Sequence, residues 1–306
     1  MKILISGSHG LVGRALIKEL SSKGHDIARL IREAPSSSAD VEWHPERGMI
    51  DAEKIGGFEV ILHLAGESIV KGQWTEEKKR RIRESRVLGT QLLSNTLARS
   101  VRPPNVFVSA SAIGIYGNRG DEVLTEDSRP GHDFLADVCV DWEKATAPAE
   151  EKGIRVVKAR FGIILAKEGG ALAKMLPPFR MGIGGKVGGG QQWMSWIALD
   201  DVVSALRLAM DQKTISGPVN FVAPNPVTNA SFTKSLGRTL GRPTFLPVPA
   251  FGARLAFGEM ADALLLTSQR VEPKRLNESG FRFAYPKLQD ALTHILHGRL
   301  SKIIVT

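Results

Sequence analysis

Short apolar runs alternate with segments of helical periodicity over the first two thirds of the chain. The runs are rich in aliphatic and β-branched residues, which predicts buried strands at 2–6, 26–31, 59–66, 105–112 and 154–165. Between them, apolar positions recur every three to four residues behind residue 10, over 85–96 and over 141–151, which predicts helices. This alternation predicts an α/β fold with a Rossmann-type, doubly wound parallel sheet.

The pattern changes from residue 166. Glycine and proline crowd 167–190, and 176–190 is the most loop-like part of the chain. The remaining predicted elements are a strand and helix over 196–210, a strand at 217–223, helices at 231–240, 250–266 and 291–296, and a turn-rich segment at 273–286. We therefore expect two domains. One is a cofactor-binding Rossmann domain of 1–165 plus about 196–223, and the other a smaller C-terminal substrate domain of about 166–195 plus 224–306.

The first predicted strand leads directly into a glycine turn. Glycines fall three residues apart, in the spacing G-x-x-G-x-x-G, and a helical pattern starts immediately behind the first two. The free N–H groups of a first helical turn and the helix dipole attract an anion, and glycine lets a pyrophosphate approach the backbone. The turn therefore predicts a dinucleotide site, with a plain βα turn as the alternative. The residues expected to contact the cofactor here are Gly7, Ser8, His9, Gly10, Leu11, Val12 and Gly13.

The end of the second predicted strand bears on the choice of cofactor. An acidic residue at this position binds the ribose 2′-hydroxyl of NAD, whereas an arginine suits the 2′-phosphate of NADP. Here Arg32 follows the last apolar residue of the strand, and Glu33 is the alternative residue for the contact with the ribose. Because a guanidinium matches a phosphate bidentately, we expect NADP(H). The alternative for Arg32 is a solvated surface arginine.

Composition narrows the class of protein. The chain has 306 residues with 42% hydrophobic and 24% charged, and its single cysteine, Cys139, fits a reducing compartment. No apolar run approaches the ~18 residues of a membrane span, and the apolar start breaks too early for a signal peptide. We therefore expect a cytoplasmic protein that binds a small-molecule substrate, without a membrane partner.

The net charge of +9 has two interpretations, an anionic ligand such as NADP or a nucleic acid. The densest basic run, 76–86, alternates its signs like a solvated helix face, and no nucleic-acid-binding motif accompanies it. We therefore expect no nucleic-acid partner. The seven histidines are scattered and one cysteine cannot build a thiolate site, so no metal site is expected.

Four segments together resemble an extended short-chain dehydrogenase/reductase of the nucleotide-sugar epimerase type. Residues 6–13 match the family's T-G-x-x-G-x-x-G, 63–66 its H-x-A turn, 86–93 its N-V-x-G-T-x-x-L-L and 109–117 its S-S-x-x-V-Y-G. Segments 188–202 and 217–228 resemble the return from the family's substrate domain. The resemblance implies a Rossmann fold and further cofactor contacts at Leu64, Ala65, Gly66, Ser109 and Ile163.

The chain departs from this family at its catalytic pair, Y-x-x-x-K. Aligning the family's helix-borne glutamate on Glu143 places Leu135 where the tyrosine belongs and Cys139 where the lysine belongs. Leucine has no proton to exchange, and a thiol cannot supply the fixed positive charge. The only tyrosines, Tyr116 and Tyr285, cannot take over by a shift of register.

With this departure, the chain resembles a narrower branch of the family, the "epimerase family protein" group with its own C-terminal domain. The segments that carry the likeness are 65–67, Trp74, 85–86, 142–143, 176–185 and 273–281. The resemblance implies NADP(H) binding and leaves the substrate open. In this branch Arg86 replaces an asparagine that faces the cofactor, so its cation could reach a cofactor phosphate. Arg81 is a second candidate, with a solvated helix face as the equal alternative.

The candidate catalytic residues follow the fourth strand. The family places a hydroxyl that hydrogen-bonds the substrate oxygen at Ser111, although this serine could also satisfy backbone groups of a turn. Tyr116 could transfer a proton or simply pack beside the site. Glu67, His132, Asp137 with Asp141, Gln192 and Trp193 are weaker candidates, each with a surface or packing role as the alternative.

Two functions therefore compete. The first is an NADP(H)-dependent oxidoreductase or epimerase-like enzyme, acting on a small carbonyl or hydroxyl substrate with repurposed acid–base residues. The second is a protein that binds or senses NADP(H) without turnover. The sequence leaves the oligomeric state open between monomer and homodimer.

Overall fold

An eight-stranded sheet forms the centre of the computed structural model, which describes residues 1–35, 37 and 39–298. Its order is β12-β8-β6-β5-β1-β2-β3-β4, and every neighbouring pair is parallel except β3 with β4. The strands are β1 (Lys2–Ser6), β2 (Asp26–Ile31), β3 (Val41–His44), β4 (Met49–Ile50), β5 (Val60–His63), β6 (Val106–Ala112), β8 (Arg155–Phe161) and β12 (Gly217–Phe221). The doubly wound parallel sheet is confirmed. The order reverses between β1 and β5, so ligands are expected beyond the carboxyl ends of these strands.

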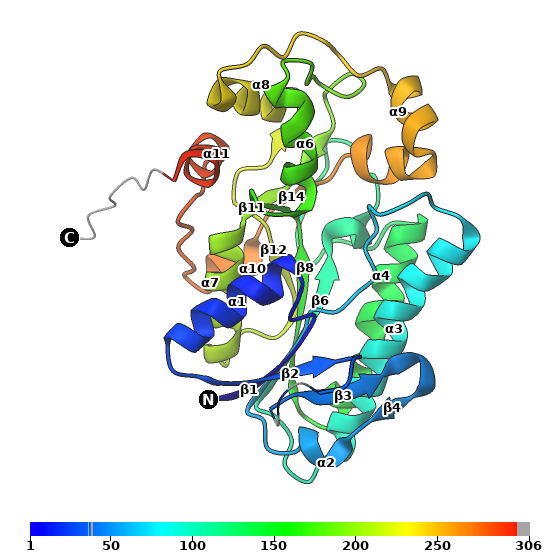
Figure 1. Cartoon of the computed structure of the whole chain (residues 1–306), viewed down its shortest axis with the longest axis vertical. Coiled ribbons are helices and arrows are strands. Elements are labelled where there is room, and N and C mark those ends of the chain that lie inside the picture. The colour runs from blue at the N-terminus through cyan, green and yellow to red at the C-terminus, as the bar shows by residue number, and fades with distance from the viewer. Residues whose placement is uncertain (36, 38, 299–306) are drawn as a thin grey trace, which may run out of the picture.

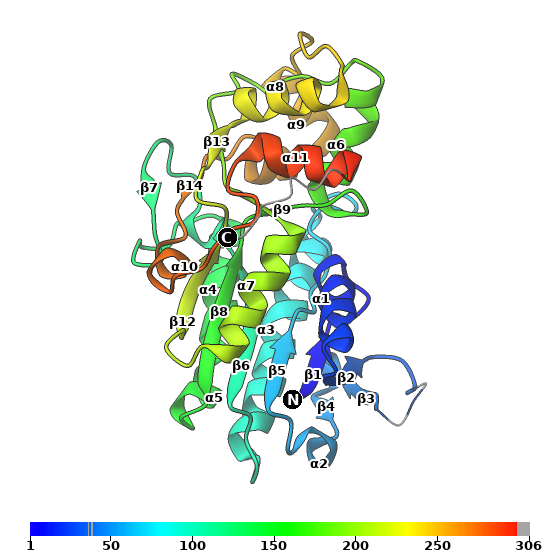
Figure 2. The same ribbon diagram turned by 90° about the vertical axis from the view of Figure 1, so that its left-hand side faces the viewer.

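Two layers of helices cover the sheet, one on each face (Figure 1, Figure 2). Alternate side chains of β1 point to opposite faces, so that Ile3 and Ile5 pack with α1 and α7 while Leu4 packs toward α3 and α5. The helices are α1 (Leu11–Ser22), α2 (Ala52–Ile55), α3 (Glu76–Arg99), α4 (Phe134–Lys144), α5 (Ala147–Glu151), α6 (Gly170–Arg180), α7 (Leu199–Asp211), α8 (Asn229–Leu240), α9 (Ala250–Phe257), α10 (Lys274–Glu278) and α11 (Leu288–His297). Three further single turns are η1 (Pro45–Arg47), η2 (Ile113–Tyr116) and the π-helical η3 (Ala261–Leu265).

A third hydrophobic cluster lies at the end of the molecule opposite the N-terminus. It joins α6, α8 and α11 through buried side chains that include Leu176, Phe179, Phe232 and Leu292. Three short pairs complete the fold here: β9 (Ile163–Leu165) with β11 (Trp196–Ala198), β10 (Trp193–Met194) with β13 (Val227–Thr228), and β7 (Val123–Leu124) with β14 (Arg270–Val271). This cluster draws on the segments assigned to the smaller domain, and the division into two domains stays a prediction.

Several predicted elements differ from the structure. The helix over 141–151 is divided between the end of α4 and α5. The strand over 154–165 breaks at Gly162, where a Cβ would lie 2.6 Å from Val222 Cγ1 and 2.7 Å from the Ser195 carbonyl oxygen, so β9 leaves the sheet to pair with β11. The prediction of a loop over 176–190 was wrong for 176–180, because α6 continues through Pro177 and Pro178 to Arg180. Burial of one apolar face overrides the low helix propensity of proline here. The helix over 250–266 is interrupted at Gly258.

Candidate functional site

The glycine turn between β1 and α1 has a backbone that only glycine accepts. Gly7 has a φ of +70°, and a Cβ there would lie 2.7 Å from the Leu64 backbone. A Cβ at Gly13 would lie 2.3 Å from the Gly7 carbonyl oxygen. Gly10, the N-cap of α1, provides no side-chain cap, so the first-turn N–H groups are available to a ligand. The turn thus has the geometry of an anion site.

A second turn, after β5, is held against this first one by a buried pair. The Ser6 hydroxyl accepts hydrogen bonds from the Leu64 and Ala65 N–H groups at 3.1 and 3.3 Å, and its oxygen lies 2.6 Å from His63 Nδ1. Burial, together with the nearby charge of Arg32, lowers the pKa of His63 to about 4, so the ring is neutral. His63 Nε2 has no partner among the described residues. Ser6 and His63 thus position the 64–66 turn, a role that we did not predict because it needs the register of β1 against β5.

Arg32 stands at the end of β2 as an exposed cation. It forms no hydrogen bond or ion pair with any residue that the structure describes, and its charge lowers the pKa values of Glu67 and His63 across the carboxyl edge of the sheet. Arg29, by contrast, makes two hydrogen bonds to Asp40, at 2.7 and 2.6 Å. Arg32 is therefore the arginine of this strand that can receive a phosphate.

Arg86 reaches the 64–66 turn from α3. Its guanidinium donates to the Ile82 carbonyl at 3.0 Å, stacks 5.1 Å from the Trp142 ring centre, and would lie 3.5 Å from a Cβ at Gly66. Burial lowers the pKa of Arg86, and no carboxylate in the described part of the chain is bonded to it. A desolvated cation is stabilised by a nearby negative charge, and an anionic ligand bound over Gly66 would provide that charge.

Glu67 and Arg81 lie on the exposed side of the same turn. Glu67 is hydrogen-bonded to buried Lys78, which is the main reason that its pKa is lowered, so the carboxylate is engaged and ionised. This pairing argues against Glu67 as a base. Arg81 is 54% exposed and has only a 3.9 Å contact with Glu77. Its charge also acts on Glu67, so it lies near the turn, and its role toward a cofactor stays a prediction.

The candidate catalytic hydroxyls belong to one buried polar network. Ser111 donates to Glu143 Oε1 at 2.7 Å, and Arg160 clamps both oxygens of Glu143 at 2.7 and 2.8 Å. Arg160 also donates to the Tyr116 hydroxyl at 2.9 Å, and that hydroxyl donates to Asn220 Oδ1 at 2.7 Å.

Burial raises the pKa of Tyr116 to about 12 and leaves its side chain fully covered. Proton transfer from Tyr116 to a substrate therefore does not fit this structure. The Tyr116 hydroxyl is inside the protein and is already hydrogen-bonded to both Arg160 and Asn220. Ser111 is also buried but lies at the carboxyl end of β6.

Leu135 and Cys139, the positions that we aligned with the family's catalytic pair, face the turn η2. A Cβ at Gly114 would lie 3.7 Å from Leu135 Cβ and 3.9 Å from Cys139 Sγ, so both side chains pack under this turn. Burial raises the pKa of Cys139 to about 12, which keeps the thiol protonated. Asp141, on the same helix, is paired with Arg83 across to α3. Helix α4 thus offers a packing surface where the family has a proton donor.

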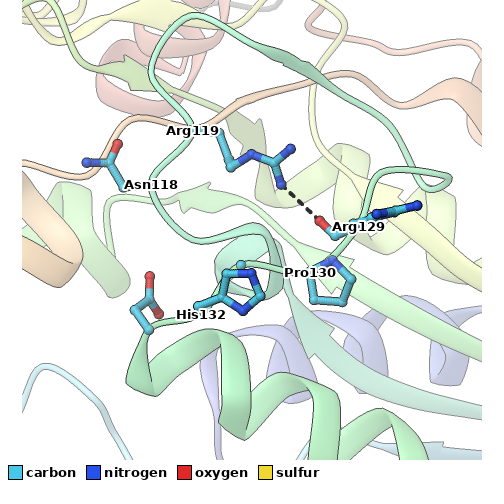
Figure 3. Close-up of a pocket in the computed structure, with 7 residues that line it drawn as sticks. Asn118, Arg119, Arg129, Pro130 and His132 are labelled. Atoms are coloured by element: carbon cyan, nitrogen blue, oxygen red, sulfur yellow. Dashed lines mark hydrogen bonds between the residues drawn. The ribbon is translucent and has the colours of Figure 1, made fainter.

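Two cavities adjoin each other beyond η2, and Asn118 lines both. The first, of about 480 Å³, is lined by Asn118, Arg119, Arg129, Pro130, Gly131, His132 and Asp133 (Figure 3). Arg119 donates to the Arg129 carbonyl at 3.1 Å (Figure 3), and Asp133 caps α4 by accepting from the Ala136 N–H at 2.9 Å. The imidazole of His132 is exposed, and Leu135 follows three residues later.

The second cavity, of about 420 Å³, lies between the 118–121 loop and the glycine-rich 188–192 loop. Its lining is Asn118, Gly120, Asp121, Gly188, Gly189, Gln191, Gln192, Ala250, Arg254, Leu266 and Ser268. Gln192 fixes the loop by donating to the Val187 and Leu265 carbonyls, and Trp193 donates to Asp121 at 2.7 Å. Trp196 is fully buried and does not line this cavity.

The other residues expected at the cofactor lie at the same edge. Ser109 lies in the middle of β6, in register with His63 at the end of β5, and Ile163 opens β9. Leu11, at the start of α1, lies 3.4 Å from where a Cβ of Gly169 would be, so the second part of the chain closes over the turn. Over the described ranges, no three His, Cys, Asp or Glu side chains form a group that could hold a metal, and no helix is long and apolar enough to cross a membrane.

A reversing parallel sheet, a glycine turn at its switch point and an H-x-A turn beside it define a Rossmann protein of the extended short-chain dehydrogenase/reductase type. The chain belongs to the NAD dependent epimerase/dehydratase family, whose model matches residues 3–222. A second model, a domain of unknown function called DUF1731, matches residues 248–295.

Relatives cover nearly the whole chain. The epimerase family protein MT2273 of Mycobacterium tuberculosis is 42% identical over 290 residues, which cover 95% of this chain and 96% of the relative. The epimerase family protein YfhF of Bacillus subtilis is 38% identical and covers 98% of this chain and 99% of its own. The crystal structure of human epimerase family protein SDR39U1 with NADPH superposes with a TM-score of 0.89 at 31% identity, covering 96% of this chain and 99% of that one.

Proposed function

We propose that the chain binds NADPH across the carboxyl edge of its sheet. The observation that carries this proposal is the glycine turn packed on the Leu64 backbone, with uncapped N–H groups that would hold the pyrophosphate. Arg32, which lacks a partner among the described residues, would bind the 2′-phosphate. Arg86 would reach a cofactor phosphate over Gly66, with Arg81 as an outer cation. The human relative solved with NADPH supports this assignment.

We further propose an oxidoreductase or epimerase-like reaction on a small carbonyl or hydroxyl substrate. NADPH supplies a hydride when bound, and the chain must hold the substrate and manage a proton. The cavities beside η2 offer the space, and exposed His132 lines the first one next to Asp133. Ser111 would hydrogen-bond a substrate oxygen by exchanging its bond to Glu143. His132 and Ser111 thus take the roles that Leu135 and Cys139 cannot.

The test follows the absorbance of NADPH. Purified protein is first titrated with NADPH to establish binding and then mixed with a broad panel of aldehydes and ketones. The reverse panel uses NADP+ with alcohols. If the protein is an oxidoreductase, the absorbance of NADPH falls or rises with at least one class of compound. We expect His132→Ala and Ser111→Ala to lower the rate of this absorbance change without changing the affinity for NADPH.

A second candidate is a protein that holds NADPH without turnover. It is favoured by the absence of an accessible proton donor where the family has one: Leu135 is apolar, Cys139 is protonated and buried, and Tyr116 is fully covered. If NADPH binds tightly and both panels stay flat, the oxidoreductase proposal fails. An epimerase returns the hydride and leaves the absorbance unchanged, so the epimerase-like proposal fails only if the panel compounds also keep their configuration. If NADPH does not bind, both fail.

A further inference from the structure

Large apolar side chains are exposed on α9 and on the segment before it. These elements lie at the end of the molecule opposite the N-terminus (Figure 1). Leu255 is 88% exposed, Phe245 75% and Phe251 74%. We call this set the apolar face; its members are Met181, Ile183, Phe245, Leu246, Val248, Phe251, Leu255 and Phe257. Single exposed apolar residues are ordinary, but a gathered set marks an interaction surface.

The apolar face comes from two segments that are distant in the sequence and adjacent in space. Residues 185–188 run beside 245–248 through bridges of Gly185 with Phe245 and of Val187 with Val248. The Val248 N–H donates to the Lys186 carbonyl at 2.8 Å, and the Gly188 N–H donates to the Val248 carbonyl at 2.9 Å. Helix α9 begins two residues later. The exposed side chains therefore share one edge of the molecule.

Cations without carboxylate partners flank this face. Arg180, Lys186 and Arg242 are exposed and form no ion pair within the described part of the chain. The carboxylates nearby are already engaged, since Asp262 pairs with Arg254 at 2.9 Å and Glu259 with Lys79 at 2.5 Å. The uncompensated charge at the apolar face is therefore positive.

The charge of the whole chain is divided in the same way. Segments 166–195 and 224–306 hold 15 Lys and Arg against 6 Asp and Glu, whereas the rest of the chain holds 26 of each. The entire excess of nine positive charges thus lies in the part that carries the apolar face. A dinucleotide site at the sheet does not explain this excess, because the excess lies outside the part of the chain that forms the sheet.

We propose that the apolar face docks on an anionic membrane surface. Phenylalanine and leucine side chains would enter the boundary between headgroups and acyl chains, while the flanking cations would meet anionic headgroups. A second copy is a poorer occupant, because a two-fold contact through this face would bring three uncompensated cations of each copy together. The proposal departs from our expectation of no membrane partner, which concerned spanning segments.

The test is flotation of the purified full chain with vesicles of phosphatidylcholine alone and of phosphatidylcholine with phosphatidylglycerol. We expect binding at low salt to the anionic vesicles, at least about tenfold stronger than to the neutral ones, and a loss of binding as salt rises. The double variant Phe251→Ser/Leu255→Ser and the double variant Lys186→Glu/Arg242→Glu should each weaken it at least about tenfold.

Matched controls stand at the other end of the molecule. Val101 is 97% exposed in the α3–β6 connection, and Lys213 is exposed after α7. Val101→Ser and Lys213→Glu should bind vesicles as the unchanged chain does, and NADPH affinity should be equal in all variants, which shows that each is folded. The proposal is overturned if no vesicle binds, if Lys213→Glu weakens binding as much as the face variants, or if the face variants instead abolish a dimer or the capture of an acidic protein.

Discussion

At the scale of residues, two arginines support the cofactor proposal for different physical reasons. Arg32 is exposed and lacks a partner in the described structure, so a phosphate there would gain a charge-assisted bond. Arg86 is partly buried and desolvated, so a bound anion would offset the desolvation cost of its cation. Mutation of either arginine is thus expected to weaken NADPH binding, and only the loss of Arg86 is expected to affect stability.

Replacing Arg32 should change cofactor choice and leave the fold intact. We expect Arg32→Asp to weaken NADPH binding by ~1–3 kcal/mol and to leave NADH binding nearly unchanged, because only the 2′-phosphate contact is lost. Fluorescence titration with both cofactors measures this. Arg99→Asp, at the exposed end of α3, is the matched control. Equal losses for both cofactors would refute the role of Arg32.

Replacing Arg86 should separate binding from stability. Because no described carboxylate is left behind, we expect Arg86→Met to keep or slightly raise the free energy of unfolding and to weaken NADPH binding by ~1–3 kcal/mol. Urea unfolding without cofactor and NADPH titration give the two quantities. A variant that unfolds more easily but binds NADPH normally would show that Arg86 is a structural residue.

The residues of the site were only partly predictable from sequence. The glycines and Arg32 stand at strand ends that a local pattern reveals. The surroundings of Tyr116 were not visible, because Arg160 and Asn220 lie 44 and 104 residues further along the chain. A motif gave the position of this tyrosine, and only the packing of β8 and β12 beside it shows that its hydroxyl is covered.

At the scale of elements, six of the eight strands of the sheet followed from apolar periodicity, whereas β3 and β4 were not predicted. Two further exceptions have physical causes. Gly162 ends a strand because two neighbouring backbones approach it, and Pro177 and Pro178 stay helical because Leu176 and Phe179 are buried around them. Neither cause is local in sequence. The turns after β1 and β5 were predicted, but the Ser6–His63 pair that joins them was not.

This pair makes stability depend on pH. His63 has a pKa of about 4 in the folded state against 6.5 in its ordinary state, so the unfolded chain binds the proton more tightly. The stability that this histidine contributes is therefore complete above pH 6.5 and is lost as the pH falls toward 4, by about 3 kcal/mol.

Urea unfolding between pH 7.5 and about 4 checks this, with the slope compared in His63→Asn. His25→Asn, which changes a partly exposed histidine, is the control. We expect the unchanged chain and His25→Asn to lose stability more steeply than His63→Asn. Identical slopes in all three would mean that His63 does not titrate as a buried neutral ring. If His63→Asn does not fold, the pKa of His63 is measured directly by NMR titration of the unchanged chain.

At the scale of the whole molecule, the chain combines a part without net charge, which holds the sheet, with a strongly basic second part. The sheet part has the switch-point geometry of a dinucleotide site, and the second part closes over it through contacts such as Leu11 with the 169–170 turn. The family membership and the relative solved with NADPH agree with that arrangement. What the assembled molecule lacks is an accessible proton donor at positions 135 and 139, so binding is better supported than turnover.

The most direct test of the account is therefore the affinity of the unmodified chain for NADPH against NADH, measured by calorimetry. The account predicts one site per chain that binds NADPH more tightly than NADH by about 10- to 100-fold, the range that one charge-assisted phosphate contact supplies. Equal affinities would contradict the role of Arg32. No binding of either cofactor would contradict the function proposed for the glycine turn.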